Sequence, residues 1–197
     1  MIRLKYPNRK QLDKFKDHLL ALPYSYDAVG ASNADFPPNF NHDYNKVFLG
    51  KGEEVWENAK AALQNWQQFP RPWTAIYSNV TPLEKDEVVV VGFHLFGFWW
   101  FNGARIVYAF DEADRYGFAY GTLTKHVEIG EEYFGIERNA EGEIHYHIKA
   151  FSRPNYWYVK LAKPLARFYQ GRFVRQSFEA MKTLATPSKV HAYASEK

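Results

Sequence analysis

Six segments typical of β-strands follow one another in the middle of the chain, and no helix-length segment separates any neighbouring pair. Turn residues, such as the run Asn139-Ala140-Glu141-Gly142, stand between them. Parallel strands need crossover connections of roughly a dozen residues or more, so these neighbours are expected to pair in antiparallel fashion. The predicted strands are Trp73–Thr81, Glu87–Leu95, Ala104–Asp111, Tyr116–Thr124, Glu132–Arg138 and Ile144–Phe151.

Helical patterns lie at both ends of this strand region. Apolar residues recur every three or four positions in Asn8–Leu22, Gly52–Phe69 and Lys163–Leu184. On the last of these helices the spacing predicts that Phe168 and Phe173 are buried core anchors. The segment from 24 to 44, which is rich in Gly, Pro and Asn, is predicted to be a loop, and residues 186–197 are predicted to be a flexible tail.

The order of these elements predicts an α+β fold in a single domain over residues 1–185. A strongly curved antiparallel sheet would wrap the long C-terminal helix, which is the helix-grip arrangement, and an additional N-terminal helix would precede it. Aromatic residues make up 18% of the chain, and such side chains favour strands and also line ligand cavities. We therefore expect a hydrophobic cavity between the sheet and the final helix.

Short motifs along most of the chain carry a family resemblance. They include Tyr26–Gly30, Leu49–Gly52, Arg105–Tyr108, Gly117–Leu123 and Phe151–Pro154, and the most specific are His126, Gly130, Glu131, Glu132 and Phe134. With these motifs the chain resembles the family called domain of unknown function nineteen-ninety, in the START-like superfamily. The resemblance implies a helix-grip fold with a hydrophobic pocket, and it implies no assigned activity. The chain departs from the family around His126, where Lys-His-Val replaces a more usual Gly-His-Pro.

The segment from Gly117 to Arg138 holds the strongest candidates for chemistry. Two adjacent carboxylates, Glu131 and Glu132, stand beside a glycine and close to His126, where a strand calls for apolar alternation. One interpretation is an acid–base pair of His126 with Glu131 or Glu132 at the mouth of the cavity. The other is structural, with these carboxylates held by backbone amides or by arginines. Adjacent strand residues point in opposite directions, so we expect one glutamate inside and the other in solvent.

Further residues are candidates for ligand binding. An aromatic hairpin spans residues 95–101, and its two adjacent tryptophans cannot both face the core, so one of them is expected to border a ligand entrance. The hairpin may be read as core, as a lid or as an interface. The ligand-binding candidates are Trp99, Trp100, Tyr108, Tyr120, Thr122 and Arg153.

Metal and cofactor chemistry find little support. His145 and His147 share one face of a predicted strand, but the opposite face looks like the core side and Lys149 follows them. There is no cysteine, which excludes disulfides, a thiol nucleophile and sulfur-ligated metals. We expect no metal and no cofactor, and both histidines are expected to face solvent.

Charge and hydropathy bear on partners and location. The longest apolar run, Val88–Phe101, contains His94 and two glycines and is too short to cross a bilayer as a helix, so we expect two strands joined near Gly97 and no integral membrane segment. The absence of cysteine and of a visible signal peptide predicts a cytoplasmic protein. The basic C-terminal region is read chiefly as a solvated face, and nucleic acid is not expected as a partner. The composition leaves a homo-oligomer open.

Three functions therefore compete. The first is a pocket protein that binds a small apolar or amphipathic ligand, lipid-like or isoprenoid-like. The second is a cyclase- or hydrolase-like enzyme that uses His126 with Glu131 or Glu132, oriented by Tyr120 or Arg153. The third is a protein that binds anionic lipid or nucleic acid through the basic C-terminal helix.

Overall fold

The computed structural model describes residues 1–78, 83–157 and 162–187. Its strands are β1 (Ile2–Arg3), β2 (Asn41–Lys51), β3 (Thr74–Tyr77), β4 (Val88–Leu95), β5 (Phe98–Asp111), β6 (Arg115–Thr122), β7 (Glu128–Arg138) and β8 (Glu143–Pro154). Its helices are α1 (Arg9–Leu20), the short 3-10 helix η1 (Ala31–Asn33), α2 (Glu53–Gln64) and α4 (Lys163–Ala185). The expected tail largely falls outside the described residues.

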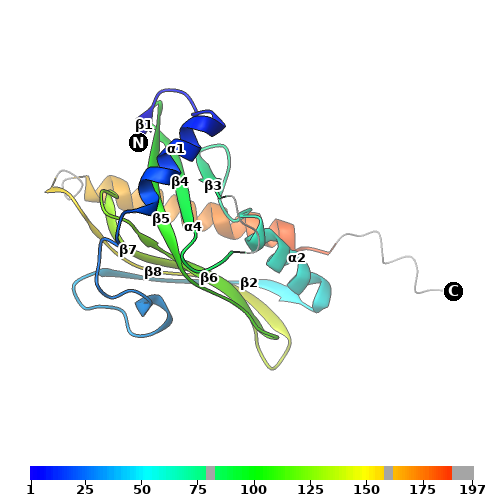
Figure 1. Cartoon of the computed structure of the whole chain (residues 1–197). Helices are drawn as coiled ribbons and strands as arrows, with labels where there is room; N and C mark the ends of the chain where they lie inside the picture. Colours follow the sequence, from blue (N-terminus) through cyan, green and yellow to red (C-terminus); the bar gives the residue numbers. More distant parts are fainter. Residues whose placement is uncertain (79–82, 158–161, 188–197) are drawn as a thin grey trace.

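The strands form one antiparallel sheet in the order β2-β8-β7-β6-β5-β4-β3, with β1 paired to β5. The curved sheet holds α4 across its concave face, so the predicted α+β helix-grip fold is confirmed (Figure 1). The predicted hairpin near Gly97 is also confirmed, because β4 ends at Leu95 and β5 begins at Phe98.

The edge strand β2 is absent from the sequence prediction, which assigned residues 24–44 to a loop. Side chains of β2 alternate between half-buried and exposed positions, but the half-buried ones include Asn41, Asp43 and Asn45, while Tyr44 and Phe48 are exposed. The apolar alternation that identifies a half-buried strand is therefore missing. The reason is that Asp43 and Asn45 line a cavity instead of packing in a dry core.

Helices cover both faces of the sheet. On the concave face α2 and α4 pack on the main core, and on the convex face α1 packs on a smaller cluster that includes Leu12 and Leu19 (Figure 1). The run Val88–Val91 is buried on both sides, since Val89 and Val91 belong to the main core while Val88 and Val90 contact the α1 side. A strand covered on both faces reads as a continuous apolar run, as this one does.

Helix α4 contacts the core through residues at four-residue spacing: Phe173, Ser177, Met181 and Ala185 are buried. Phe173 is only 7% exposed, as predicted, but the prediction for Phe168 is wrong, because that side chain is 63% exposed. Phe168 and Phe173 are five positions apart in the sequence, which places their side chains about 140° apart around a helix. Within the described residues, none of the helices is long and apolar enough to cross a membrane.

Candidate functional site

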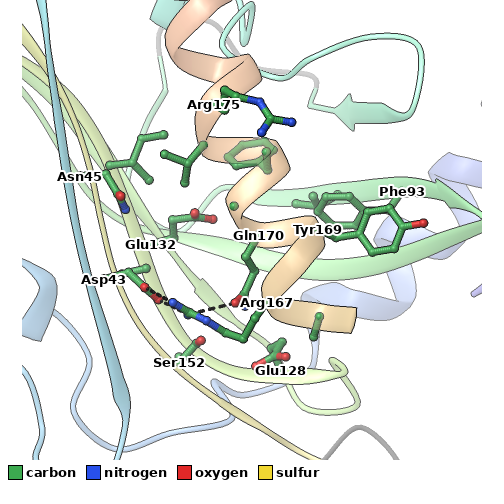
Figure 2. A pocket seen from close by; sticks show the side chains of 18 of the residues that line it. Asp43, Asn45, Phe93, Glu128, Glu132, Ser152, Arg167, Tyr169, Gln170 and Arg175 are labelled. Atoms are coloured by element: carbon green, nitrogen blue, oxygen red, sulfur yellow. Dashed lines mark hydrogen bonds and ion pairs between the residues drawn. The ribbon is translucent and has the colours of Figure 1, made fainter. Parts of the chain in front are cut away.

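A cavity of about 710 Å³ lies between the concave face of the sheet and α4 (Figure 2). One part of its wall is apolar, built from strands β4 and β8, the segment before β3, and the inner side of α4. The apolar lining residues include Trp73, Val91, Phe93, Leu95, Ile148, Phe173, Val174 and Phe178. A concave, largely apolar space of this size is typical of sites for small molecules.

The other part of the wall is polar and comes from β2, β6, the connection between β6 and β7, β7, β8 and the first turns of α4. Its members include Asp43, Tyr120, Thr122, His126, Glu128, Glu132, Ser152, Arg167 and Gln170. In Figure 2 the Glu132 side chain points from the sheet toward α4, and Glu128 and Ser152 are drawn lower in the view. The site therefore offers an apolar wall and a group of polar side chains within one space.

Glu132 is bound by Tyr120, its direct neighbour across the β6–β7 pair. The Tyr120 hydroxyl donates a hydrogen bond of 2.6 Å to Oε2 of Glu132. Burial raises the pKa of the Glu132 carboxyl to about 7, although the hydrogen bond from Tyr120 opposes the rise. Burial and the nearby carboxyl also raise the pKa of Tyr120 well above its ordinary value. Tyr120 therefore acts as a donor, and Glu132 exchanges its proton near neutral pH.

His126 and Glu128 both line the cavity, but the acid–base pair predicted from the sequence is His126 with Glu131 or Glu132. The backbone N–H of Glu128 donates to Nδ1 of His126 at 3.0 Å, so the neutral ring carries its proton on Nε2. Burial lowers the pKa of His126 to about 4 and raises the pKa of Glu128 to about 7. In the described residues no hydrogen bond joins His126 to Glu131 or Glu132, so at neutral pH this histidine is an uncharged wall residue.

Glu131 points to the convex face, and the expectation that one of the two glutamates lies in solvent is wrong, because Glu131 is buried there. Only 2% of this residue is exposed, because the loop around η1 covers it. Its carboxylate accepts hydrogen bonds from the Tyr26 hydroxyl at 2.6 Å and from the backbone N–H groups of Gly30 and Ser32 at 2.8 and 3.0 Å. The Ser32 hydroxyl donates a further bond. Gly121 permits this contact, since a Cβ there would lie 2.1 Å from the Tyr26 hydroxyl oxygen.

The two glutamates thus divide as predicted between opposite faces, but both are covered. Adjacent residues of a strand point to opposite faces. Gly130, just before the two glutamates, has a φ of +150° and no room for a side chain, since an added Cβ would lie 1.9 Å from the Phe151 carbonyl oxygen. The hydrogen-bond donors predicted for the interior glutamate are found only in part. Of the candidates Arg153, Arg167, His126, Tyr120 and Thr122, only Tyr120 hydrogen-bonds either carboxylate among the described residues.

The arginines expected near the glutamates have other partners. Arg167 on α4 forms a two-pronged ion pair with Asp43 on β2, with both N–O distances 2.7 Å, and also donates to Gln170 (Figure 2). Arg153 is exposed and lies over the ring of Phe40, 4.7 Å from its centroid. Arg167 therefore ties the final helix to the edge strand across the cavity.

The remaining ligand-binding candidates divide between the cavity and other places. Thr122 lines the cavity, and its hydroxyl accepts a bond from the Gly130 N–H. Tyr108 instead lies on the convex side with its hydroxyl 2.6 Å from that of Ser32. Trp99 stacks between His94 and Phe101, and Trp100 donates to the Leu95 carbonyl.

Among the described residues, the tryptophan that lines the cavity is Trp73, which the sequence analysis did not single out. It stands between Pro72 and β3, and its indole N–H donates to Gln176 on α4 at 2.7 Å. No motif in the sequence marks it, because its role depends on where α4 crosses the sheet. The expectation that Trp99 or Trp100 borders the entrance finds no support in the cavity lining.

The two histidines of β8 form no metal site with other described residues, where no group of three or more His, Cys, Asp or Glu side chains could hold a metal ion. The opposite face of β8 is the core side, as predicted, since Ile144, Tyr146 and Ile148 are buried. The expectation that both histidines face solvent is wrong for His147, which is buried with Nε2 3.4 Å from Glu137.

The basic residues of α4 serve more than one role. Arg167 pairs with Asp43, and Arg172 lies over the ring of Trp73, 4.8 Å from its centroid. Lys163, Arg175 and Lys182 are exposed. The helix therefore commits part of its positive charge to contacts within the protein.

Sequence comparison places the chain close to one family. The family described as Domain of unknown function (DUF1990) matches residues 25–180. A UPF0548 protein of Dictyostelium discoideum is 38% identical over 155 residues, which cover 73% of this chain and 72% of that protein. A UPF0548 protein of Deinococcus radiodurans is 33% identical over 187 residues, which cover 89% of this chain and 94% of that protein.

Solved structures with the same fold are far more distant in sequence. The hypothetical protein jhp0584 from Helicobacter pylori superposes with a TM-score of 0.57 at 11% identity, covering 83% of this chain and 99% of that one. TTHA0849 from Thermus thermophilus gives a TM-score of 0.51 at 9% identity, covering 74% of this chain and 97% of that one. At such identities the likeness shows the fold alone.

Proposed function

Because this chain belongs to the DUF1990 family and folds as a START-like helix grip, we propose that it binds a small amphipathic molecule in the cavity under α4. The observation that carries the proposal is the 710 Å³ space whose wall is apolar in one part and polar in another. An apolar chain or ring system would contact Phe93, Ile148 and Phe173. Its polar head would lie near Glu132 and Thr122.

Binding would draw on two physical terms. Apolar surface removed from water contributes roughly 25 cal/mol per Å², which supplies most of the affinity for a largely buried ligand. Polar groups placed at one part of the wall fix the orientation, because a head group lost from water must find hydrogen bonds inside. The arrangement thus favours ligands that are apolar along most of their length and polar at one end.

The direct test is native mass spectrometry of the full chain purified under non-denaturing conditions, followed by solvent extraction and identification of co-purified molecules. A neutral apolar dye, Nile red, provides a second readout through its fluorescence. We expect a defined adduct in the native spectrum and saturable dye binding that the extracted molecule reverses.

A cavity-filling variant gives the matched control. Val174 on α4 lines the cavity, whereas Val29 lies in a loop and is 43% exposed. Val174→Trp should abolish dye binding and the adduct, and Val29→Trp should leave both intact. Unchanged dye binding in Val174→Trp, with circular dichroism showing an intact fold, would place the ligand elsewhere and contradict the proposal.

A second candidate function is proton transfer on the bound molecule. It is favoured by the Tyr120–Glu132 hydrogen bond inside the cavity together with a Glu132 pKa of about 7, which suits an acid or base at neutral pH. In this version Glu132 exchanges the proton and Tyr120 orients it, while His126 stays neutral. In this proposal the Tyr120–Glu132 pair takes the role that the sequence suggested for His126 with a glutamate.

The extracted molecule decides between binding and catalysis. Incubated with the protein in deuterated water, a substrate of such an enzyme should exchange a carbon-bound hydrogen or change mass, and Glu132→Gln should stop this while the molecule still binds. A molecule recovered without exchange or change in mass would leave the protein as a binder only.

A further inference from the structure

The charges around the cavity are arranged with acids on the wall and bases at the rim. The carboxyl groups of Asp43, Glu128 and Glu132 belong to partly buried residues of the sheet. The lining cations all come from α4 and are exposed: Arg167, Arg175 and Lys182. The exposed Glu179 on the same helix also lines the cavity. The lining cations are therefore all exposed, whereas the lining acids Asp43, Glu128 and Glu132 on the sheet are partly buried.

The interior acids are unequally neutralised. Asp43 has a complete partner in Arg167, which binds both of its oxygens. Among the described residues, the Glu132 carboxyl accepts a hydrogen bond only from the uncharged Tyr120 hydroxyl, and Tyr146 on β8 is a second phenol near it. For Glu128 no hydrogen bond or ion pair to the carboxyl is found within residues 1–78, 83–157 and 162–187, although the charge of Arg167 acts on it. Two carboxyl groups thus lack a cation of their own.

Resting on the proposed function, we propose that the ligand is an amphipathic amine whose protonated nitrogen is received by Glu132, while Glu128 is a second acidic group farther along the same strand and the same wall. A buried carboxylate needs a cation and hydrogen-bond donors to remain charged. An ammonium group supplies both, since it carries a full charge and up to three N–H donors. Its apolar remainder would lie along Trp73, Phe93 and Phe173.

Other head groups fit this wall less well. A carboxylate or phosphate head would meet Glu128, Glu132 and Asp43 on the wall. Arg167 is already bound to Asp43, and the other lining cations, Arg175 and Lys182, are exposed on α4. An uncharged alcohol could hydrogen-bond Glu132 but would leave its charge uncompensated. Neutral His126 adds no positive charge at neutral pH, because burial lowers its pKa to about 4.

The test uses three probes with one chain and different heads: dodecylamine, dodecanol and dodecanoate. Each is titrated against Nile red bound to the full-length protein at pH 8, below the concentration at which it aggregates. We expect dodecylamine to bind roughly tenfold tighter than dodecanol, the effect of one charge-assisted hydrogen bond, and dodecanoate to bind weakest. Dodecanoate binding as tightly as dodecylamine would overturn the proposal and show that an arginine turns inward.

Variants test whether Glu132 receives the amine. Glu132→Gln, alone or together with Glu128→Gln, should remove the advantage of dodecylamine while the affinity for dodecanol stays within about twofold. Glu141→Gln, in the exposed turn between β7 and β8, is the matched control and should keep the advantage. An advantage that persists in the double variant would exclude these carboxyls as the amine site.

Proton release gives a readout that does not depend on any variant. The pKa of Glu132 is raised to about 7, so at pH 7 an ammonium that favours its charged form should release protons on binding. Calorimetry in two buffers of different ionisation enthalpy measures the number of protons released per bound ligand. This number should be above zero for dodecylamine and near zero for dodecanol. Equal values would contradict the proposal. Failure of all three probes to displace Nile red would instead contradict the proposed function itself.

Discussion

The hydroxyl of Tyr120 lies 2.6 Å from Oε2 of Glu132, directly across the β6–β7 pair and inside the cavity. The next residue, Glu131, points to the other face and receives donors from Tyr26, Gly30 and Ser32. Adjacent carboxylates of the same length thus have different surroundings: one is part of a ligand cavity, and the other fastens a loop.

The same substitution should therefore have opposite effects at the two positions. Every described partner of the Glu131 carboxylate donates a hydrogen bond, so the NH₂ group of Gln in Glu131→Gln must face a donor. We expect a loss of about 2–3 kcal/mol in the free energy of unfolding, as for unsatisfied buried donors. Glu132→Gln removes a buried charge and keeps an acceptor for Tyr120, so at pH 8 it should stabilise by up to about 3 kcal/mol. Urea unfolding of both variants measures this, and equal losses would contradict the assignment.

The gain from Glu132→Gln should depend on pH. The folded-state pKa of Glu132 is raised from 4.5 to about 7, so between these pH values the folded state binds more protons than the unfolded state. The contribution of Glu132 to the free energy of unfolding therefore falls as pH rises through this range. His126 and His147, with pKa values lowered to about 4, act in the opposite direction, so the wild-type profile alone is uninformative. The difference between variant and wild type should be small at pH 5 and largest above pH 7. A difference independent of pH would mean that Glu132 titrates normally.

Two phenylalanines of α4 provide a packing test. Phe173 contacts Phe69 and Phe134 in the core, so Phe173→Ala should lower the free energy of unfolding by about 3–5 kcal/mol. Phe168 is 63% exposed, and Phe168→Ala should change stability by less than about 0.5 kcal/mol. Denaturant titration compares the pair, and similar losses would show that α4 lies on the sheet by a different face.

Tryptophan fluorescence should report the ligand through Trp73. This indole lines the cavity, whereas Trp99 stacks on His94 and Phe101 away from the lining. A bound apolar quencher should lower the emission of the wild type, and Trp73→Phe should remove most of that change. Trp99→Phe is the control and should keep it. A response lost in Trp99→Phe instead would restore the aromatic hairpin as the entrance.

Much of the architecture followed from the sequence because local rules suffice for it. Antiparallel pairing follows from short connections, the hairpin at Gly97 from its turn residues, and the helix grip from the order of elements. The opposite orientation of Glu131 and Glu132 needed only the two-residue period of a strand. The sequence also placed Tyr120, Thr122, His126 and Glu132 in one segment, and all four line the cavity.

The partners of these residues were decided by the tertiary structure. The loop around η1 covers Glu131, and α4 brings Arg167 to Asp43, across 124 positions of sequence. Strand β2 was not predicted from the sequence because its inward side chains, such as Asp43 and Asn45, face a cavity and need not be apolar. That cavity exists only once α4 packs on the sheet. The sequence by itself determined which side chains share a strand face, because backbone geometry repeats every two residues. Which of them meet a loop, a helix or a cavity depends on contacts between distant segments, and only the folded chain brings those segments together.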